Sequence, residues 1–588
     1  MKLTTEQEAI IASDSDLIVN AVAGSGKTTT VIEYARTRPE GSRILYLAFN
    51  KTVKLEASAK FRDKGVFNVQ VETAHSLAYS HIIPRSNYTL NSNGYRPHEV
   101  AELLRIESIG DKHGEFMLAK HVLRLFTYFC NSGAKRVADL DYTAIVFDPK
   151  AREFVSKNIE VILMYTRLFL AKMDRAEIPI THDFYLKKFQ LSEPQLPFDY
   201  ILFDEGQDAS AAMLDIFGKQ SATKVIVGDT HQQIYNWRFA VNSLEKVDYR
   251  ELGLNTSFRF GQEIADLANE ILKSKSIFSN NACNKIVGKG ENRKVQTKAV
   301  LARTNLGLLL KAIDYVGEKK ADKIYFEGNI SSYAYAEDGT SLYDVLNLKE
   351  GKFDRIRDKL LRRMTSLDEL EDYVEKTEEH QLGMMIELVK EYGSRIPKIL
   401  KELKEKHIGS ENKSEADLIF STVHRSKGME YDAVHIVDDF ATAESLEKVY
   451  TNRKDEDLDL AKLSEEVNLL YVAVTRAKAK VFIPMSLLPE TIAPSKFIIA
   501  LKSTEKQQEV FVEKLSPKSQ ANKEESYMER VRKTHKKAYA PWTEALDDEL
   551  TVLYCEGLPI RDMAKHFGRT NGAIRSRIKK LELDEKYR

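Results

Sequence analysis

The sequence predicts an α/β protein with two parallel-sheet domains, each carrying a helical insertion, followed by a small all-α domain of three helices. Short apolar runs alternate with helical patterns in two separate stretches, as in parallel sheets covered by helices on both faces. A charged helical segment interrupts each stretch, and a polar segment precedes a compact helical pattern near the C-terminal end. These three observations define the predicted domains.

The first sheet domain is predicted from apolar runs at 17–19, 43–49, 69–73, 200–204 and 224–229. We assign residues 1–85 and 185–258 to this domain and the helical residues 86–184 to its insertion. In that insertion, residues 115–129 are apolar or aromatic around much of the helix, which indicates a core helix rather than a ligand site.

The second sheet domain is predicted from runs at 298–304, 417–422, 433–437 and 480–484. It comprises residues 259–305 and 412–500, and residues 306–411 form its charged helical insertion. That insertion contains the capping-box pattern Ser-Leu-Asp-Glu at 366–369.

The remaining residues divide into a charged linker, 501–538, and a three-helix domain, 539–588. Trp542 and a helix-like run open this domain, and Ile560, Met563, Ala564 and Phe567 form one apolar helix face.

Composition limits the possible partners. Lys plus Arg and Asp plus Glu both number 88, so a nucleic-acid surface would have to be local rather than a property of the whole chain. The three cysteines are far apart, which excludes a four-cysteine zinc site and fits a reducing compartment. No apolar stretch reaches membrane-spanning length and no export signal opens the chain. We therefore expect a cytoplasmic, nucleoid-associated protein without a membrane partner.

Residues 18–30 have the pattern of a phosphate-binding loop between a strand and a helix. Gly24 and Gly26 allow successive N–H groups to point inward at an anion. Lys27 supplies a positive charge, and Thr28 offers a hydroxyl to Mg²⁺. Ala21 stands where the general pattern has its first glycine, so the motif alone leaves a plain strand-to-helix turn as the alternative.

Two further strand ends carry chemistry. Asp204 and Glu205 follow a buried strand, as in phosphate-loop enzymes where one carboxylate holds Mg²⁺ and the next orients the attacking water. The alternative is simple solvation of a loop. Residues 226–238 lead from a polar strand end to Tyr235 and Trp237, which are suited to stacking on bases. Alternatively, these two rings fill a domain interface.

Together these segments resemble the superfamily-1 helicases of the UvrD/Rep type, in family order over residues 1–500. Residues 181–187 further resemble the F-box DNA helicase branch, although no F-box is found. The segments that carry the resemblance are 3–7, 21–28, 47–51, 73–76, 204–208, 228–238, 257–259, 302–305, 421–431 and 466–478.

The resemblance implies two RecA-like motor domains with ATP and Mg²⁺ between them. It implies catalytic roles for Lys27, Glu205, Gln232, Arg259 and Arg476, the last as an arginine finger. The nucleotide-binding residues would be Gln7, Ala23, Gly24, Ser25, Gly26, Lys27, Thr28, Thr29, Phe258 and Glu430, with Thr28 and Asp204 holding the metal. Two positions depart from the family: Phe239 replaces a usual glycine, and Thr29 replaces an arginine that often flanks adenine, which weakens the expectation of adenine selectivity.

The same resemblance implies contacts with single-stranded DNA from Phe49, Asn50, Thr73, His75, Tyr235, Trp237, Arg238, Thr422 and His424. The predicted function is an ATP-dependent DNA helicase or translocase that moves 3′ to 5′ on single strands and duplex junctions in repair or recombination. The alternatives are an ATP-driven translocase that clears proteins from DNA and a regulatory DNA-binding factor, neither of which separates strands.

The C-terminal domain resembles a Myb-like helix-turn-helix. Asn571, Arg575 and Lys579 recur at helical spacing opposite its apolar seam, which suits a groove of duplex DNA. The alternative is a charged face on a protein-docking module.

Overall fold

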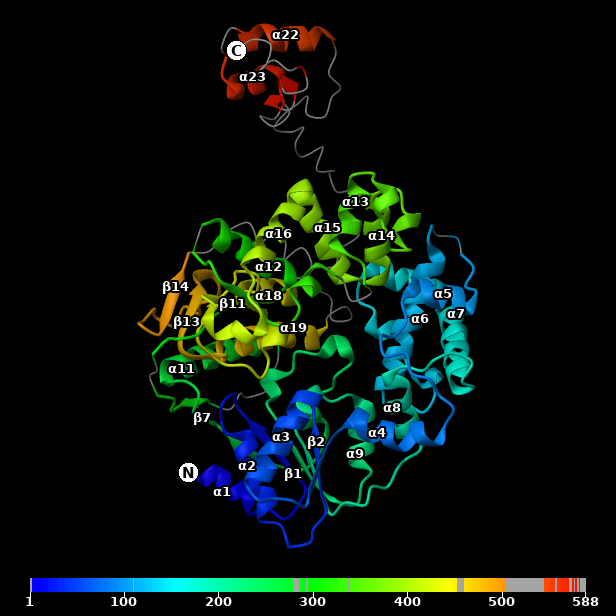
Figure 1. Ribbon diagram of the computed structural model, residues 1–588, viewed down its shortest axis with the longest axis vertical. Coiled ribbons are helices and arrows are strands. Elements are labelled where there is room, and N and C mark those ends of the chain that lie inside the picture. The colour runs from blue at the N-terminus through cyan, green and yellow to red at the C-terminus, as the bar shows by residue number, and fades with distance from the viewer. Residues whose placement is uncertain are drawn as a thin grey trace. The chain divides into compact units, whose positions relative to one another are not determined.

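The computed structural model describes the chain except for residues 1–2, 109, 111, 279–284, 292–293, 319, 336–338, 452–458, 503–543, 556–557, 570–573, 576, 579–580 and 582–588. The chain divides into two compact units, Met1–Pro517 and Lys518–Arg588. The two predicted sheets and their insertions all lie in the first unit (Figure 1).

The first sheet has six parallel strands in the order β3-β2-β4-β5-β1-β6. The strands are β1 (Leu17–Ala21), β2 (Ile44–Ala48), β3 (Val69–Thr73), β4 (Tyr200–Phe203), β5 (Thr223–Gly228) and β6 (Arg250–Leu254). The helices of this domain are α1 (Thr5–Ile11), α2 (Lys27–Arg36), α3 (Lys51–Asp63), α4 (Ala74–Ile82), α9 (Ala211–Gly218) and α10 (Ser243–Lys246). Because β4, β5 and β1 are neighbours, the segments that follow them meet at one edge of the sheet, where ligands of open α/β sheets bind.

The second sheet also has six parallel strands, in the order β10-β11-β9-β12-β13-β14. The strands are β9 (Lys298–Ala302), β10 (Ile324–Phe326), β11 (Leu418–Thr422), β12 (Tyr431–Ile436), β13 (Ala477–Pro484) and β14 (Ile498–Leu501). Figure 1 shows α11 (Gln262–Lys273) and α19 (Leu460–Val474) on one face and α12 (Asn305–Gly317) on the other. The other elements of this part are the strand pair β7 (Thr256–Ser257) and β8 (Val287–Gly288) and the helices α17 (Val423–Ser426) and α18 (Ala443–Thr451).

Every strand predicted from an apolar run is present within a few residues of its expected ends, but β6, β10 and β14 were not predicted. All three lie at sheet edges, and β10 and β14 are only three or four residues long, too short for a periodicity to show. The strand β10 and the helix α12 fall inside residues 306–411, the predicted helical insertion. The sheet therefore extends further along the chain than predicted, because both elements pack against β11.

The two insertions are helical and contact each other. The first contains α5 (Pro97–Leu104), α6 (Gly114–Asn131) and α7 (Pro149–Asp174), and is followed by α8 (His182–Leu191). The second contains α13 (Leu342–Lys349), α14 (Leu367–Thr377), α15 (His380–Tyr392) and α16 (Ile396–Lys406). The helix α14 packs on α6 and α7, and His121 Nε2 donates to the carbonyl of Lys376 at 2.9 Å. The prediction that residues 115–129 form a core helix is confirmed, since Phe116, Leu118 and Val122 are buried.

The second unit contains α22 (Glu544–Cys555), α23 (Ile560–Phe567) and helical residues at 574–575 and 577–578. The predicted apolar face is confirmed, because Met563, Ala564 and Phe567 are buried together with Leu550 and Ile574. Trp542, Asn571 and Lys579 lie outside the described residues, whereas Arg575 is described and exposed. No helix in the described part of the chain is both long and apolar enough to cross a membrane.

Candidate active site between the two sheet domains

The phosphate loop joins β1 to α2 and has the shape that an anion needs. Gly24 and Gly26 have φ angles of +74° and +84°, the left-handed region that favours glycine. A Cβ atom added at Gly24 would lie 2.5 Å from the Cβ of Arg259, so no larger residue fits there. The hydroxyl of Ser25 is buried without a partner among the described residues, and α2 begins directly at Lys27. The loop therefore fits a nucleotide phosphate.

The other predicted nucleotide-binding residues of the first domain surround this loop. Gln7 is buried beside Gly26, and its side-chain nitrogen donates to the Thr30 hydroxyl at 3.1 Å. Thr28 and Thr29 lie in the first turn of α2, and the backbone N–H of Phe258 donates to the Gly24 carbonyl at 2.9 Å. The structure therefore places these residues around the phosphate loop. The side-chain amide of Gln7 is hydrogen-bonded to Thr30 of the same chain.

Lys27 and the paired carboxylates form the charged centre of the first domain. Lys27 Nζ lies 3.0 Å from Glu205 Oε1. Burial alone would lower the pKa of Lys27, but the negative charges of Glu205 and Asp204 raise it. Burial would likewise raise the pKa of Glu205, yet the positive charges of Lys27 and Lys427 lower it to about 2. Glu205 is therefore ionised near pH 7, as a group that orients water must be.

Asp204 differs from its neighbour. Its carboxylate accepts hydrogen bonds from the Tyr46 hydroxyl and, at 3.0 Å, from the backbone N–H of Glu205. Burial and the adjacent charge of Glu205 raise its pKa. A cation bound between Asp204 and Thr28 would relieve this unfavourable burial of negative charge.

Arg476 enters the site from the second domain as a buried cation. It is 1% exposed, and its guanidinium donates to the carbonyls of Val472 at 3.1 Å and Met429 at 3.3 Å. It also donates to Gln232 Oε1 at 3.5 Å, so its bonds in the described part of the chain go to uncharged oxygens. Burial, with repulsion from Arg259, lowers its pKa to about 9. An anion bound here would balance the positive charges of Arg476 and Arg259.

Arg259 and Glu430 of the second domain contact each other next to the phosphate loop of the first. Arg259 Nε donates to Glu430 Oε1 at 2.9 Å, and its Nη1 donates to the Thr475 carbonyl at 2.8 Å. Lys478 lies 3.3 Å from the other carboxylate oxygen of Glu430. The structure therefore brings together the residues predicted to reach the γ-phosphate and the ribose.

A row of aromatic side chains lies next to this centre. The rings of Phe49 and Tyr235 are stacked with centroids 5.7 Å apart, and Trp237 follows at 6.4 Å from Tyr235. Trp237 is 48% exposed, and the guanidinium of Arg238 lies 4.6 Å from its ring centroid. The row is therefore open on the Trp237 side, where a base could stack.

The other predicted DNA contacts of the first domain stand at helix starts. Asn50 and Thr73 cap α3 and α4 by accepting hydrogen bonds from Val53 N and Ser76 N. His75 lies 3.8 Å from Asp183. These three side chains are at least partly exposed.

Thr422 of the second domain is buried, and His424 is partly buried against the first domain. Thr422 is 6% exposed, and His424 Nε2 donates to the Ile234 carbonyl at 3.0 Å. Burial, with repulsion from Arg303, lowers the pKa of His424 to about 4, so its ring is neutral. Tyr235 in turn donates to the His424 carbonyl at 3.2 Å. His424 therefore contacts the first domain, and its predicted contact with a DNA strand remains a prediction.

Sequence reasoning missed the residues that join the two domains. Lys427 Nζ is paired with Asp208 and donates to the Gln232 carbonyl at 2.7 Å. Tyr471 donates to Asp229 Oδ2 at 3.0 Å, and Gln232 donates to the same oxygen at 2.6 Å. Lys427 and Tyr471 are each more than 190 residues away in the sequence from the residues they contact. No local sequence pattern could therefore indicate these contacts.

Glu465 is a further missed residue, and it leads to a pH prediction. It accepts a hydrogen bond from the backbone N–H of Asn236 at 3.3 Å, and burial together with Glu466 raises its pKa to about 8. The folded protein therefore holds a proton that the unfolded chain releases above about pH 4.3. The stability contributed by this group is present below that pH and is lost as the pH rises to 8.

We expect Glu465→Gln to raise the unfolding temperature relative to the unmodified chain by an amount that grows from pH 5 to pH 8. Differential scanning calorimetry across this range measures the difference. Glu444→Gln, at an exposed carboxylate paired with Lys448, is the control and should show no such growth. A pH-independent difference for Glu465→Gln would contradict the assignment.

Two family models match consecutive parts of the chain. The model for the UvrD/REP helicase N-terminal domain matches residues 3–246, and the model for the UvrD-like helicase C-terminal domain matches residues 308–487. The F-box DNA helicase 1 of Gallus gallus is 29% identical over 522 residues, 83% of this chain and 49% of its own. The F-box DNA helicase protein 1 of Schizosaccharomyces pombe is 28% identical over 525 residues, 82% of this chain and 57% of its own.

A more distant relative is the ATP-dependent DNA helicase PcrA of Staphylococcus aureus, 27% identical over 305 residues, 46% of this chain and 40% of its own. The chain thus spans about half the length of the curated relatives it matches.

The chain has two parallel-sheet domains. The first carries a phosphate loop, and a buried arginine of the second donates to Gln232 of the first. This combination defines a tandem RecA-like protein of the helicase class. Both halves match their family models in the expected order. The chain belongs to the UvrD-like helicases. The resemblance predicted from the motifs is thereby confirmed, while the Myb-like nature of the C-terminal domain remains a prediction.

Proposed function

We propose that this protein is an ATP-dependent DNA helicase that translocates on single-stranded DNA. One observation carries the proposal: the same interface holds an ATP-type site and the aromatic row. Gln232 bonds Arg476 on one side, and the chain continues within three residues to Tyr235, which stacks on Phe49. A change at the phosphate site therefore reaches the row through a very short segment.

ATP is the substrate that fits the site, with Mg²⁺ as its metal. Lys27 and the phosphate loop would hold the phosphates, and Arg476 would stabilise the charge that develops during transfer. Thr28 and Asp204 would hold Mg²⁺, which neutralises phosphate charge when bound. The described residues contain no group of three or more His, Cys, Asp or Glu placed to hold a metal alone, so phosphate oxygens and water would complete its shell.

Lys427 connects the second domain to both the acidic segment of the phosphate site and the aromatic row. Its ammonium is paired with Asp208 of the acidic segment and lies 5.2 Å from the ring centroid of Tyr235. Movement of the second domain relative to the first would therefore displace the aromatic row. Such domain closure is a common way to convert ligand binding into motion.

We expect Trp237→Ala to weaken binding of single-stranded DNA by about 1–3 kcal/mol, because one stacked base is lost. Fluorescence anisotropy with a labelled oligonucleotide measures the affinity, and ATP hydrolysis should continue but become less dependent on DNA. The control is Phe67→Ala, which removes another exposed aromatic ring, 79% exposed, from the first domain. If the folded Trp237→Ala variant binds single-stranded DNA as tightly as the unmodified chain, Trp237 serves only in packing.

The direction of movement proposed here is 3′ to 5′, with a role in repair or recombination. The support for both is the membership of the UvrD-like helicases, since the names of the relatives state only DNA helicase. Unwinding of duplexes with a 3′ or a 5′ single-stranded tail tests it: only the 3′-tailed duplex should be separated. ATP hydrolysis on both substrates without strand separation would favour the alternative, a translocase that clears proteins from DNA.

The C-terminal unit is proposed to bind duplex DNA. Of the residues predicted to contact DNA there, Arg575 is described by the structure, and its side chain is exposed. Removing residues 518–588 should leave ATP hydrolysis intact, lower duplex affinity and reduce the dependence of that affinity on salt. Unchanged duplex binding after this deletion would favour a protein-docking role.

A further inference from the structure

One face of the second sheet is only partly covered. Along β13, Ala479, Val481 and Ile483 are buried, whereas Lys480 and Phe482, on the opposite face, remain partly exposed. A parallel sheet normally has both faces covered by helices. Here α12 packs on β9 and β11, whereas His435 of β12, Phe482 of β13 and Ile499 of β14 are only partly buried.

Strand register orders the accessible side chains into two rows. Lys298 of β9 and Lys480 of β13 are both paired with Ala433 of β12, so the two lysines flank one small residue. In the next row, Phe482 lies between His435 and Ile499. A row with a basic residue at each end therefore runs beside an apolar and aromatic row.

A hollow of about 520 Å³ opens over Lys298, Ala433, His435 and Phe482, and Lys480 lies beside it on the same face of β13 as Phe482. Its aromatic wall consists of Tyr315, His435 and Phe482, and the rings of the last two are stacked 6.1 Å apart. Tyr315 and His435 are hydrogen-bonded to each other at 2.6 Å, which fixes both rings. Burial, aided by nearby lysines, lowers the pKa of His435 to about 4, so this wall is uncharged near pH 7. The hollow is thus preformed, as ligand sites usually are.

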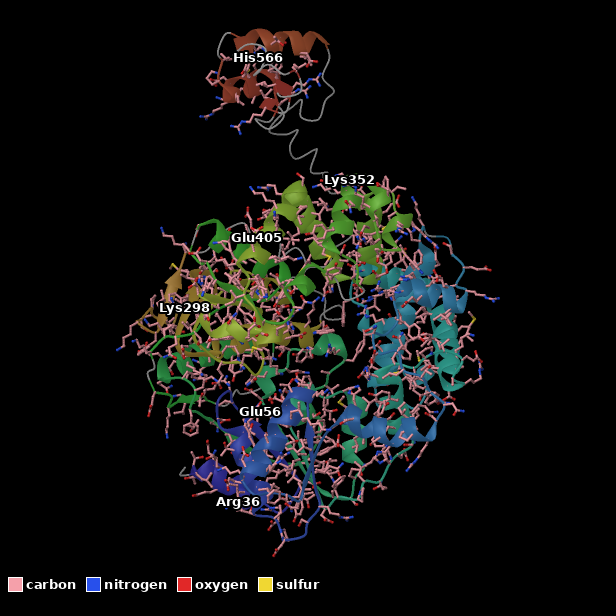
Figure 2. All side chains as sticks on the ribbon, in the orientation of Figure 1. Arg36, Glu56, Lys298, Lys352, Glu405 and His566 are labelled. Atoms are coloured by element: carbon pink, nitrogen blue, oxygen red, sulfur yellow. The ribbon has the colours of Figure 1, made fainter. Side chains whose placement is uncertain are left out.

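The charges around the hollow favour an acidic occupant with apolar side chains. Lys298, labelled in Figure 2, is exposed and Lys480 is half-buried, and neither is ion-paired with a carboxylate in the described part of the chain. Asp322 and Asp417 line the opposite part of the hollow. A short acidic segment can place its carboxylates at the lysines and its apolar side chains on the aromatic wall, whereas a continuous phosphate backbone would also have to pass these two aspartates, which makes nucleic acid the less favoured occupant.

We propose that this surface, defined by Lys298, Tyr315, His435, Lys480 and Phe482, binds an acidic segment of a partner protein that inserts apolar or aromatic side chains between the two lysines. Lys478, which pairs with Glu430 of the candidate nucleotide site, precedes Lys480 on the same face of β13, so the surface borders that site without including its residues.

The test is selection of peptides from a random dodecapeptide library displayed on phage, with the full chain as target. We expect enriched peptides with several acidic residues around aromatic or aliphatic ones. Binding of such a labelled peptide, followed by anisotropy, should weaken by about tenfold or more in the double variant Lys298→Glu, Lys480→Glu. The matched control Lys398→Glu, Lys401→Glu reverses two exposed lysines on α16 and should bind normally.

All variants should keep their circular dichroism spectrum and ATP hydrolysis, since none of these lysines lies in the phosphate site. Phe482→Ala supplies a second variant that keeps the charges, and it should also lose peptide binding. Failure to enrich any peptide, or peptide binding that survives both the charge reversal and Phe482→Ala, would overturn the proposal. So would competition by an oligo-dT strand, which would assign the surface to nucleic acid. Binding that appears only after removal of the residues beyond 502 would assign it to the chain's own continuation.

Discussion

Replacing Lys27 by alanine is expected to lower the turnover number of ATP hydrolysis by about 10²–10³-fold, the usual cost of removing one charge-stabilising donor. Lys27 stands at the start of α2, directly after the phosphate loop, and its ammonium is 3.0 Å from Glu205. The alanine variant loses the only lysine of this loop and also removes one of the two cations that hold the pKa of Glu205 at about 2. Steady-state phosphate release in the presence of single-stranded DNA measures the effect.

Two further variants separate loss of chemistry from loss of fold. Arg36→Ala changes an exposed cation at the other end of α2, paired with Glu33 and labelled in Figure 2, and should hydrolyse ATP normally. Lys27→Arg keeps a positive charge beside Glu205, so it should fold even if the alanine variant does not, yet it should be impaired because the guanidinium has a different shape. Normal turnover in folded Lys27→Ala would remove the phosphate loop from the catalytic site.

Replacing Arg476 by alanine is expected to lower the turnover number by about 10³-fold or more while changing ATP affinity much less, as is typical of an arginine finger. The structure gives the reason. The guanidinium is buried, all of its described bonds go to uncharged oxygens, and one of them goes to Gln232 of the other domain. Such a group gains most when negative charge develops next to it.

The separate measurement of turnover and nucleotide affinity decides between this role and a structural one. A fluorescent ATP analogue reports affinity, and phosphate release reports turnover. Lys448→Ala, on the exposed side of α18, should change neither. Equal losses of affinity and turnover in Arg476→Ala would indicate that Arg476 only helps to bind the nucleotide.

The sequence was sufficient for the parts of the site that follow directly on strands. Lys27, Asp204 and Gln232 come soon after β1, β4 and β5, and parallel strands bring their carboxyl ends to one edge. Motif patterns therefore predicted both the fold and this half of the site. The edge strands β10 and β14 were missed, because a strand of three or four residues carries too little periodicity.

Pairing across the domain boundary could not be predicted. Lys427 and Asp208 both lie in motif segments, but their contact depends on how the two domains meet. Thr422 and His424 were expected to contact DNA; Thr422 is buried and His424 bonds the Ile234 carbonyl of the first domain, so their contact with DNA remains a prediction. The motifs identify residue types, and only the packed structure shows which partner each side chain has.

The coupling between DNA binding at the aromatic row and ATP hydrolysis is tested most directly by the rate of hydrolysis with and without single-stranded DNA. This rate is measured for the unmodified chain and for Trp237→Ala. The aromatic row and the phosphate site share one interface, so DNA should accelerate phosphate release severalfold in the unmodified chain and less in the variant. Hydrolysis that proceeds at the same rate whether or not a single strand is present would contradict the account.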